Sequence, residues 1–170
     1  AVSSWQRIAD NALPPRVKST ANYVNNRAAE LTARLDGYDG ALMLSADGKL
    51  SEGTGACVFL VRGGQLITPD GASDILESIT RDTVMQAART VHGLVVQERR
   101  VDRTELLAAE EAFLCGSGQE VVPIVAVDRI AVGDGQPGPV TRLIQDHYFR
   151  LVRGEIADHT AWRTPVWPGQ

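Results

Sequence analysis

Hydrophobic residues recur at helical spacing in three stretches of the chain: residues 22–35 (NYVNNRAAELTARL), 79–93 (ITRDTVMQAARTVHG) and 140–154 (VTRLIQDHYFRLVRG). Apolar positions three and four residues apart form one face of a helix, so the pattern predicts three amphipathic helices. Residues at the ends of these three stretches are typical of helix termini. Gly37 follows the first stretch, Ser78 or Thr80 can cap the second, and Pro139 and Gly154 bound the last.

Shorter hydrophobic runs, separated by turn residues, predict strands at residues 41–45, 49–53, 56–62, 64–68, 94–101, 111–118 and 121–135. The first four are expected to form an antiparallel meander, and the last a strand followed by a hairpin. A short helix is predicted at 101–111, where Asp102 and Glu105 have the spacing of a capping box. Mixed strands and helices predict one α/β (α+β) domain.

Composition narrows the range of partners. A chain of 170 residues, 44% hydrophobic, can bury one sizeable core. Its net charge of −4 and pI near 5.4 offer no basic surface, so we expect no nucleic-acid partner. No apolar run approaches the roughly 18 residues of a membrane span, so no membrane partner and a cytoplasmic location are expected. Cys57 and Cys115 lie in apolar runs, which favours reduced, buried thiols.

The two ends of the chain differ from its middle. Residues 1–16 begin with Ala and contain a proline pair but no signal-peptide pattern, which is typical of a linker from an upstream domain. We therefore expect residues 1–16 to be an interdomain linker and residues 17–156 to be the main domain. Residues 157–170 have no periodicity and are expected to form a surface tail.

Lysine is scarce in this chain, since Lys18 and Lys49 stand against fifteen arginines. Lysine, unlike arginine, can lose its proton and act as a nucleophile or base. Lys18 directly precedes a predicted helix that carries Tyr23, and Glu52 precedes a glycine-bracketed turn. Alone, each residue is more often an ordinary surface or packing residue. No zinc, Walker or dinucleotide motif occurs, so no metal is expected.

Two further segments can hold an anion. The sequence SITRD at 78–82 opens a helix, whose first N–H groups are unsatisfied, and Gly116-Ser117-Gly118 places a hydroxyl between two glycines. An amine, an acid, a phenol and two phosphate cradles are the groups that pyridoxal 5'-phosphate requires. The acid would keep the pyridine nitrogen protonated, because a nearby negative charge favours the cationic form.

Several sequence blocks together resemble the C-terminal, cofactor-binding domain of class IV aminotransferases, closest to the branched-chain group. These blocks are SSWQRIADNALPPRVKSTANYVNN, SEGTGACVFLV, ILESITRD, AEEAFLCGSGQEVVPI and GDGQPGPVTRLIQDHYFRLVRGE. The resemblance implies the large C-terminal domain of fold type IV pyridoxal phosphate enzymes, for which residues 17–156 would bind the cofactor. Such enzymes are usually homodimers and carry an N-terminal domain that has no counterpart here.

The resemblance also implies residue roles. Lys18 falls on the Schiff-base lysine, Tyr23 on the partner of the ring oxygen and Glu52 on the partner of the pyridine nitrogen. The remaining positions are Leu76 against the ring, Ile79, Thr80 and Ser117 at the phosphate, Arg7 in support, and Gly118 near substrate. The usual GTAAE block is GSGQE here, and a frequent Asn is Cys57, so the substrate side departs from the family pattern.

The implied activity is transamination between an amino acid, branched-chain or similar, and a 2-oxo acid such as 2-oxoglutarate. A separate or cleaved N-terminal domain chain is then an expected partner. The alternatives are a D-amino acid or amine transaminase, an aminodeoxychorismate lyase, and an inactive half-domain that serves as an interaction module.

Overall fold

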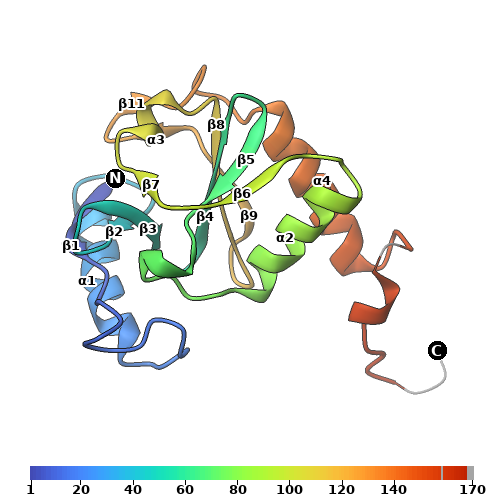
Figure 1. The fold of residues 1–170 in the computed structure, drawn as a ribbon, viewed down its shortest axis with the longest axis horizontal. Helices are drawn as coiled ribbons and strands as arrows, with labels where there is room; N and C mark the ends of the chain where they lie inside the picture. The colour runs from blue at the N-terminus through green and yellow to red at the C-terminus, as the bar shows by residue number, and fades with distance from the viewer. Residues whose placement is uncertain (158, 168–170) are drawn as a thin grey trace.

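The computed structural model describes residues 1–157 and 159–167. Its strands form two main sheets, which lie side by side in Figure 1. One sheet has the order β1-β2-β3-β7, with strands at Val2–Gln6, Leu42–Leu44, Lys49–Gly53 and Val101–Asp102. The other has the order β6-β5-β4-β8-β9, with strands at Val96–Glu98, Gln65–Thr68, Cys57–Arg62, Glu111–Gly116 and Glu120–Ile124. The pairs β1–β2 and β5–β6 are parallel, and the other pairs are antiparallel.

Helices cover the two sheets separately (Figure 1). Helix α1 (Asn22–Leu35) lies against the β1–β2 side and packs Ala29 and Ala33 on Met43. Helices α2 (Ile79–Thr90) and α4 (Pro139–Arg153) cover the other sheet, where their apolar faces join a core around Phe59 and Phe113. These two rings stack with centroids 5.0 Å apart.

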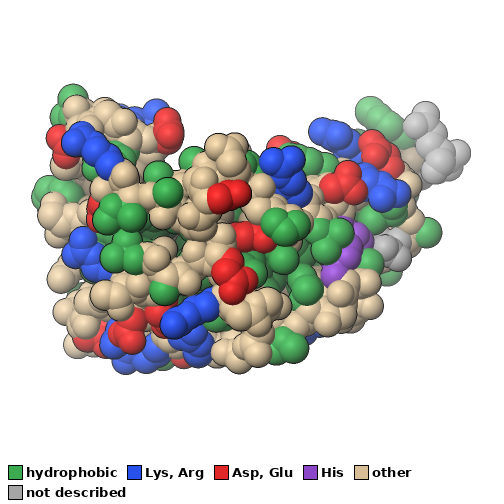
Figure 2. Space-filling view, turned by 90° about the horizontal axis from the view of Figure 1, so that it is seen from above, with side chains coloured by type: hydrophobic (Ala, Val, Ile, Leu, Met, Phe, Trp, Pro, Cys, Tyr) green, Lys and Arg blue, Asp and Glu red, His purple; other side chains and the backbone are tan. Residues whose placement is uncertain are grey.

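A second core cluster joins the two sheets, because it draws on Leu42 and Leu50 from one sheet and Val58 and Leu60 from the other. The remaining elements are α3 (Glu105–Ala108), the hairpin of β10 (Ala126–Val127) and β11 (Ile130–Ala131), and the 3₁₀ turns η1 (Gly71–Ser73) and η2 (Thr160–Trp162). On the face drawn in Figure 2, acidic and basic side chains are interspersed with hydrophobic ones.

The three long helices are confirmed. Ser78 is the N-cap of α2, with its Oγ accepting from the Arg81 N–H, and Asp82 lies in the first turn. Gly154 ends α4 with φ +77°, a left-handed conformation that suits glycine. The helix predicted at 101–111 is shorter: α3 has Thr104 at its N-cap, although the Glu105 carboxylate does accept from the Asp102 N–H.

The single meander is wrong. Strands β2 and β3 pair in one sheet and β4 and β5 in the other, because the chain turns between Gly53 and Ala56 and leaves the first sheet. Gly53 fits this crossing closely, since a Cβ there would come within 3.1 Å of the Ala56 carbonyl oxygen. The predicted strand 94–101 likewise divides into β6 and β7, which belong to different sheets.

The terminal segments also differ from the prediction. Val2–Gln6, within the predicted linker 1–16, forms strand β1 and pairs with β2, a strand that the sequence did not indicate. The described residues of the predicted tail 157–170 are mostly exposed, and positions 158 and 168–170 lie outside the described part. The domain boundaries remain a prediction. Within the described residues, no helix is long and apolar enough to cross a membrane.

Candidate active site

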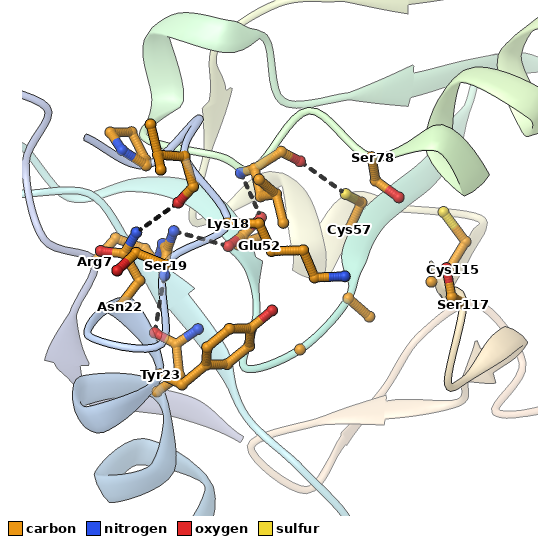
Figure 3. A pocket seen from close by; sticks show the side chains of 17 residues that line it. Arg7, Lys18, Ser19, Asn22, Tyr23, Glu52, Cys57, Ser78, Cys115 and Ser117 are labelled. Atoms are coloured by element: carbon orange, nitrogen blue, oxygen red, sulfur yellow. Dashed lines mark hydrogen bonds and ion pairs between the residues drawn. The ribbon is translucent and has the colours of Figure 1, made fainter. Parts of the chain in front are cut away.

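A cavity opens where the two sheets meet (Figure 3). The cavity has a volume of about 70 Å³. Its walls come from the segment before α1, α1 itself, the β3–β4 turn, the loop before α2 and the end of β8. Six of the residues predicted for the site line it: Arg7, Lys18, Tyr23, Glu52, Leu76 and Ser117. The structure therefore brings most of the predicted constellation together.

Lys18 lies on the loop that leads into α1, and its amine extends into the cavity (Figure 3). The loop is held by Asn22, whose side-chain nitrogen donates to the carbonyl oxygens of Pro14 at 3.2 Å and Val17 at 3.0 Å. Tyr23 follows Asn22 in α1, and Figure 3 shows its hydroxyl directed toward the same space as the amine. The first turn of α1 thus fixes the base of the lysine and presents the phenol.

Glu52 is the acid of the site and is buried in β3, with 6% of its surface exposed. One carboxylate oxygen forms an ion pair with Arg7 Nη2 at 3.0 Å, and the other accepts from the Leu76 N–H at 3.0 Å. Burial raises the pKa of Glu52 to about 7, although the Arg7 charge and the Leu76 N–H act in the opposite direction. With a pKa of about 7, Glu52 changes between its protonated and ionised forms near neutral pH.

The opposite wall has features of an anion site. Ser78, at the N-cap of α2, and Ser117, after β8, both line the cavity. The N–H groups of the first helical turn have no partner within the helix and carry its positive dipole end. Ile79, Thr80 and Gly118 are not among the lining residues; Ile79 is 86% exposed and Thr80 is buried. The structure therefore does not bring these three predicted residues into the cavity wall.

Two buried thiols complete this wall. Cys57 and Cys115 are free and lie directly opposite each other on β4 and β8. Burial raises the pKa of Cys57 to about 12 and that of Cys115 well above its ordinary value. Both thiols are therefore protonated at neutral pH and serve as packing groups. No cluster of three metal-binding side chains occurs among the residues that the structure describes.

The sequence did not indicate three polar residues that line the cavity: Ser19, Asn22 and Asn26. Ser78 belongs to the segment that was predicted to hold an anion, and it also lines the cavity. Asn22 and Asn26 lie four residues apart on the buried side of α1. Their spacing next to Tyr23 was the available signal, because four-residue spacing places two side chains on one helix face.

The fold and the cavity define a domain that places an amine, a buried acid and a helix N-terminus around one small space. The amino-transferase class IV family model matches residues 1–127, and the chain belongs to this family. A probable branched-chain-amino-acid aminotransferase from Aquifex aeolicus is 41% identical over 98% of this chain and 53% of its own length. The Escherichia coli K12 branched-chain-amino-acid aminotransferase is 39% identical over 97% of this chain and 53% of its own length.

Solved structures that superpose on this chain are also branched-chain aminotransferases. The branched-chain amino acid aminotransferase of Thermobaculum terrenum, in its PLP form, superposes with a TM-score of 0.95 at 54% identity, covering 98% of this chain and 54% of that protein. The branched-chain aminotransferase of the archaeon Thermoproteus uzoniensis, solved with norvaline, superposes with a TM-score of 0.93 at 41% identity, over 98% and 55% of the two chains. The predicted fold type IV architecture is confirmed. The chain spans about half the length of these relatives.

Proposed function

We propose that the chain supplies the cofactor-binding half of a pyridoxal 5'-phosphate-dependent aminotransferase. It would act between an amino acid, branched-chain or similar, and a 2-oxo acid such as 2-oxoglutarate. The observation that carries this proposal is the cavity shared by Lys18, Tyr23 and Glu52, in a chain 39–54% identical to branched-chain aminotransferases.

The donor set fits the cofactor. Each carboxylate oxygen of Glu52 accepts one contact, from Arg7 or from the Leu76 N–H, so lone pairs remain for a ring nitrogen. Leu76 supplies an aliphatic wall beside the acid, and the start of α2 with Ser78 and Ser117 supplies donors for a phosphate. Amine, acid and phosphate donors thus lie on different walls of one cavity.

When bound, the cofactor supplies an electron sink that stabilises negative charge at the substrate α-carbon. Lys18 would hold the cofactor aldehyde covalently and, once released by substrate, move a proton with its Nζ. Glu52 would keep the ring nitrogen protonated, and Tyr23 would donate to the ring oxygen. Arg7 keeps a positive charge against Glu52, which favours the ionised carboxylate.

The cavity is too small to be a complete binding site for a cofactor and a substrate. The cavity volume of about 70 Å³ is well below the roughly 300–1,000 Å³ of typical ligand pockets. We infer that an N-terminal domain, on a separate or cleaved chain, covers the cofactor and completes the substrate pocket. A homodimer of the complete enzyme and a cytoplasmic location remain predictions from the family resemblance and the composition.

The experiment is borohydride reduction after incubation with pyridoxal 5'-phosphate, with and without the N-terminal half of a relative. We expect yellow protein, loss of colour on reduction, and a phosphopyridoxyl label on Lys18 by peptide mass spectrometry. Lys18→Arg should abolish labelling, whereas Lys49→Arg, which changes the other lysine, should retain it. Protein that stays colourless in both arms would refute the proposal.

Substrate choice is tested on the same assembled protein. Consumption of an amino donor that depends on a 2-oxo acid supports a transaminase. Pyruvate release without an acceptor would identify the lyase alternative, and absence of turnover despite cofactor uptake would identify an inactive module.

A further inference from the structure

Asn26 connects three segments of the site through one amide side chain. Its side-chain oxygen accepts from Arg7 Nη1 at 2.8 Å, and its side-chain nitrogen donates to the Thr54 carbonyl oxygen at 2.8 Å. Thr54 lies in the turn that follows Glu52, and Arg7 lies directly after β1. Asn26 is 5% exposed and lines the cavity. It therefore ties α1 to both segments that flank the acid.

The guanidinium of Arg7 is held from three directions. Nη2 faces Glu52 at 3.0 Å, Nε donates to the Asp74 carbonyl oxygen at 3.2 Å, and Nη1 donates to Asn26 at 2.8 Å. A guanidinium is a rigid planar fork, so fixing two of its nitrogens sets the direction of the third. The oxygen of Asn26 is thus one of two acceptors that aim Nη2 at Glu52.

We propose that Asn26 is a positioning residue, which holds Arg7 in the orientation that pairs with Glu52 and thereby controls the ionisation of that acid. The role of the acid toward a ring nitrogen rests on the proposed function. The relation between Asn26, Arg7 and Glu52 does not, because it concerns contacts within the chain itself.

The other ionisable groups around Glu52 come from different elements. Lys18 lies on the loop before α1, Tyr23 on α1, Cys57 on β4 and Cys115 on β8, all lining the same cavity. Among the described side chains, Arg7 is the cation that contacts the carboxylate. A group that moves Arg7 should therefore move the titration of Glu52 more than a group elsewhere in the wall.

The test is a double-mutant cycle on the cofactor-free protein, read by NMR titration of ¹³Cδ-labelled glutamate. The Glu52 signal is assigned from its loss in Glu52→Gln. We expect Asn26→Leu, which keeps the side-chain volume, to raise the Glu52 midpoint by about half to one pH unit. Arg7→Met should raise it further, and adding Asn26→Leu to Arg7→Met should then have no effect.

Two results would overturn the proposal. One is an Asn26→Leu midpoint equal to or below that of the unmodified protein. The other is a shift of the same size in the Arg7→Met background, since Asn26 would then act without Arg7. If Asn26→Leu does not fold, Asn26→Ala is titrated under the same criteria.

Gln145→Leu is the matched control. It removes a side-chain amide on α4 that donates to the Val121 carbonyl oxygen of β9 at 2.8 Å. It should leave the Glu52 midpoint unchanged. A shift like that of Asn26→Leu would indicate general loosening and overturn the proposal. Failure of the cofactor hypothesis looks different: pyridoxal 5'-phosphate uptake would be absent in every variant while the Asn26–Arg7 coupling persists.

Discussion

Replacing Glu52 with glutamine should change how the stability of the cofactor-free protein depends on pH. The folded protein raises the pKa of Glu52 from its ordinary value of 4.5 to about 7. Between these values the unfolded chain has already lost the proton that the folded protein retains. Stability from this group is therefore present below pH 4.5, falls as pH rises toward 7, and is constant above that.

The magnitude follows from the size of the shift. Each pKa unit corresponds to about 1.4 kcal/mol, so a rise from 4.5 to about 7 corresponds to about 3 kcal/mol. Glutamine keeps the shape and removes the proton equilibrium. It leaves the Arg7 charge without its counter-ion at every pH, which adds a nearly constant offset. The wild-type advantage over Glu52→Gln should therefore shrink by about 3 kcal/mol from pH 4.5 to pH 8.

Urea unfolding of both proteins at several pH values between 4.5 and 8 measures this difference. Glu155→Gln, at an exposed position after α4, controls for the loss of one acidic group. An advantage that stays constant within about 0.5 kcal/mol across the range would refute the reasoning, because it would mean that the protonation of Glu52 is the same in folded and unfolded chains.

Glu105 and the two buried cysteines give further predictions, and the pKa of Glu105 is lowered where that of Glu52 is raised. Hydrogen bonds from Arg99 hold the pKa of Glu105 near 2, so Glu105→Gln should cost about 2 kcal/mol at pH 7 in urea unfolding. This loss of stability is fully present above pH 4.5 and should disappear as the pH falls through about 2. An equal loss at pH 7 and at about pH 2 would contradict the prediction. Cys57 and Cys115, buried with raised pKa values, should react with iodoacetamide far more slowly at pH 8 than in urea, as followed by intact-mass measurement.

The helices could be predicted from the sequence because their signals are local. Periodicity and terminal residues such as Ser78 and Gly154 act within a few positions of each helix. Sheet pairing is not local. The runs around β3 and β4 give the same strand signal, and only the packing of the whole chain decides that they join different sheets. Strand β1 is exposed along much of its length, so its hydrophobic pattern was weak.

The site divides in the same way. That Lys18, Tyr23 and Glu52 share one cavity could be predicted, because the family resemblance places these three residues in one site. For Asn22 and Asn26 the four-residue spacing was the available signal, and it is weak, since asparagine near a helix start is usually a capping or surface residue. Their roles arise from the loop and the arginine that the fold brings against α1.

Glu52 is a buried carboxylate whose unfavourable burial is compensated by partners from other parts of the fold. It lies two residues after Leu50 in β3, so both side chains project from the same face of the strand, and Leu50 is fully buried in the core between the sheets. A carboxylate at a core-facing strand position is unfavourable unless partners compensate it. Here the partners come from Arg7 and Leu76, which are distant in sequence, so the acid is tolerated only when both sheets and the loop before α2 have assembled. A one-residue slip of β3 would turn Glu52 to the other face and separate it from both partners. The contacts of Glu52 with Arg7 and Leu76 therefore require the correct pairing of β3, and the site forms only in the fully assembled fold.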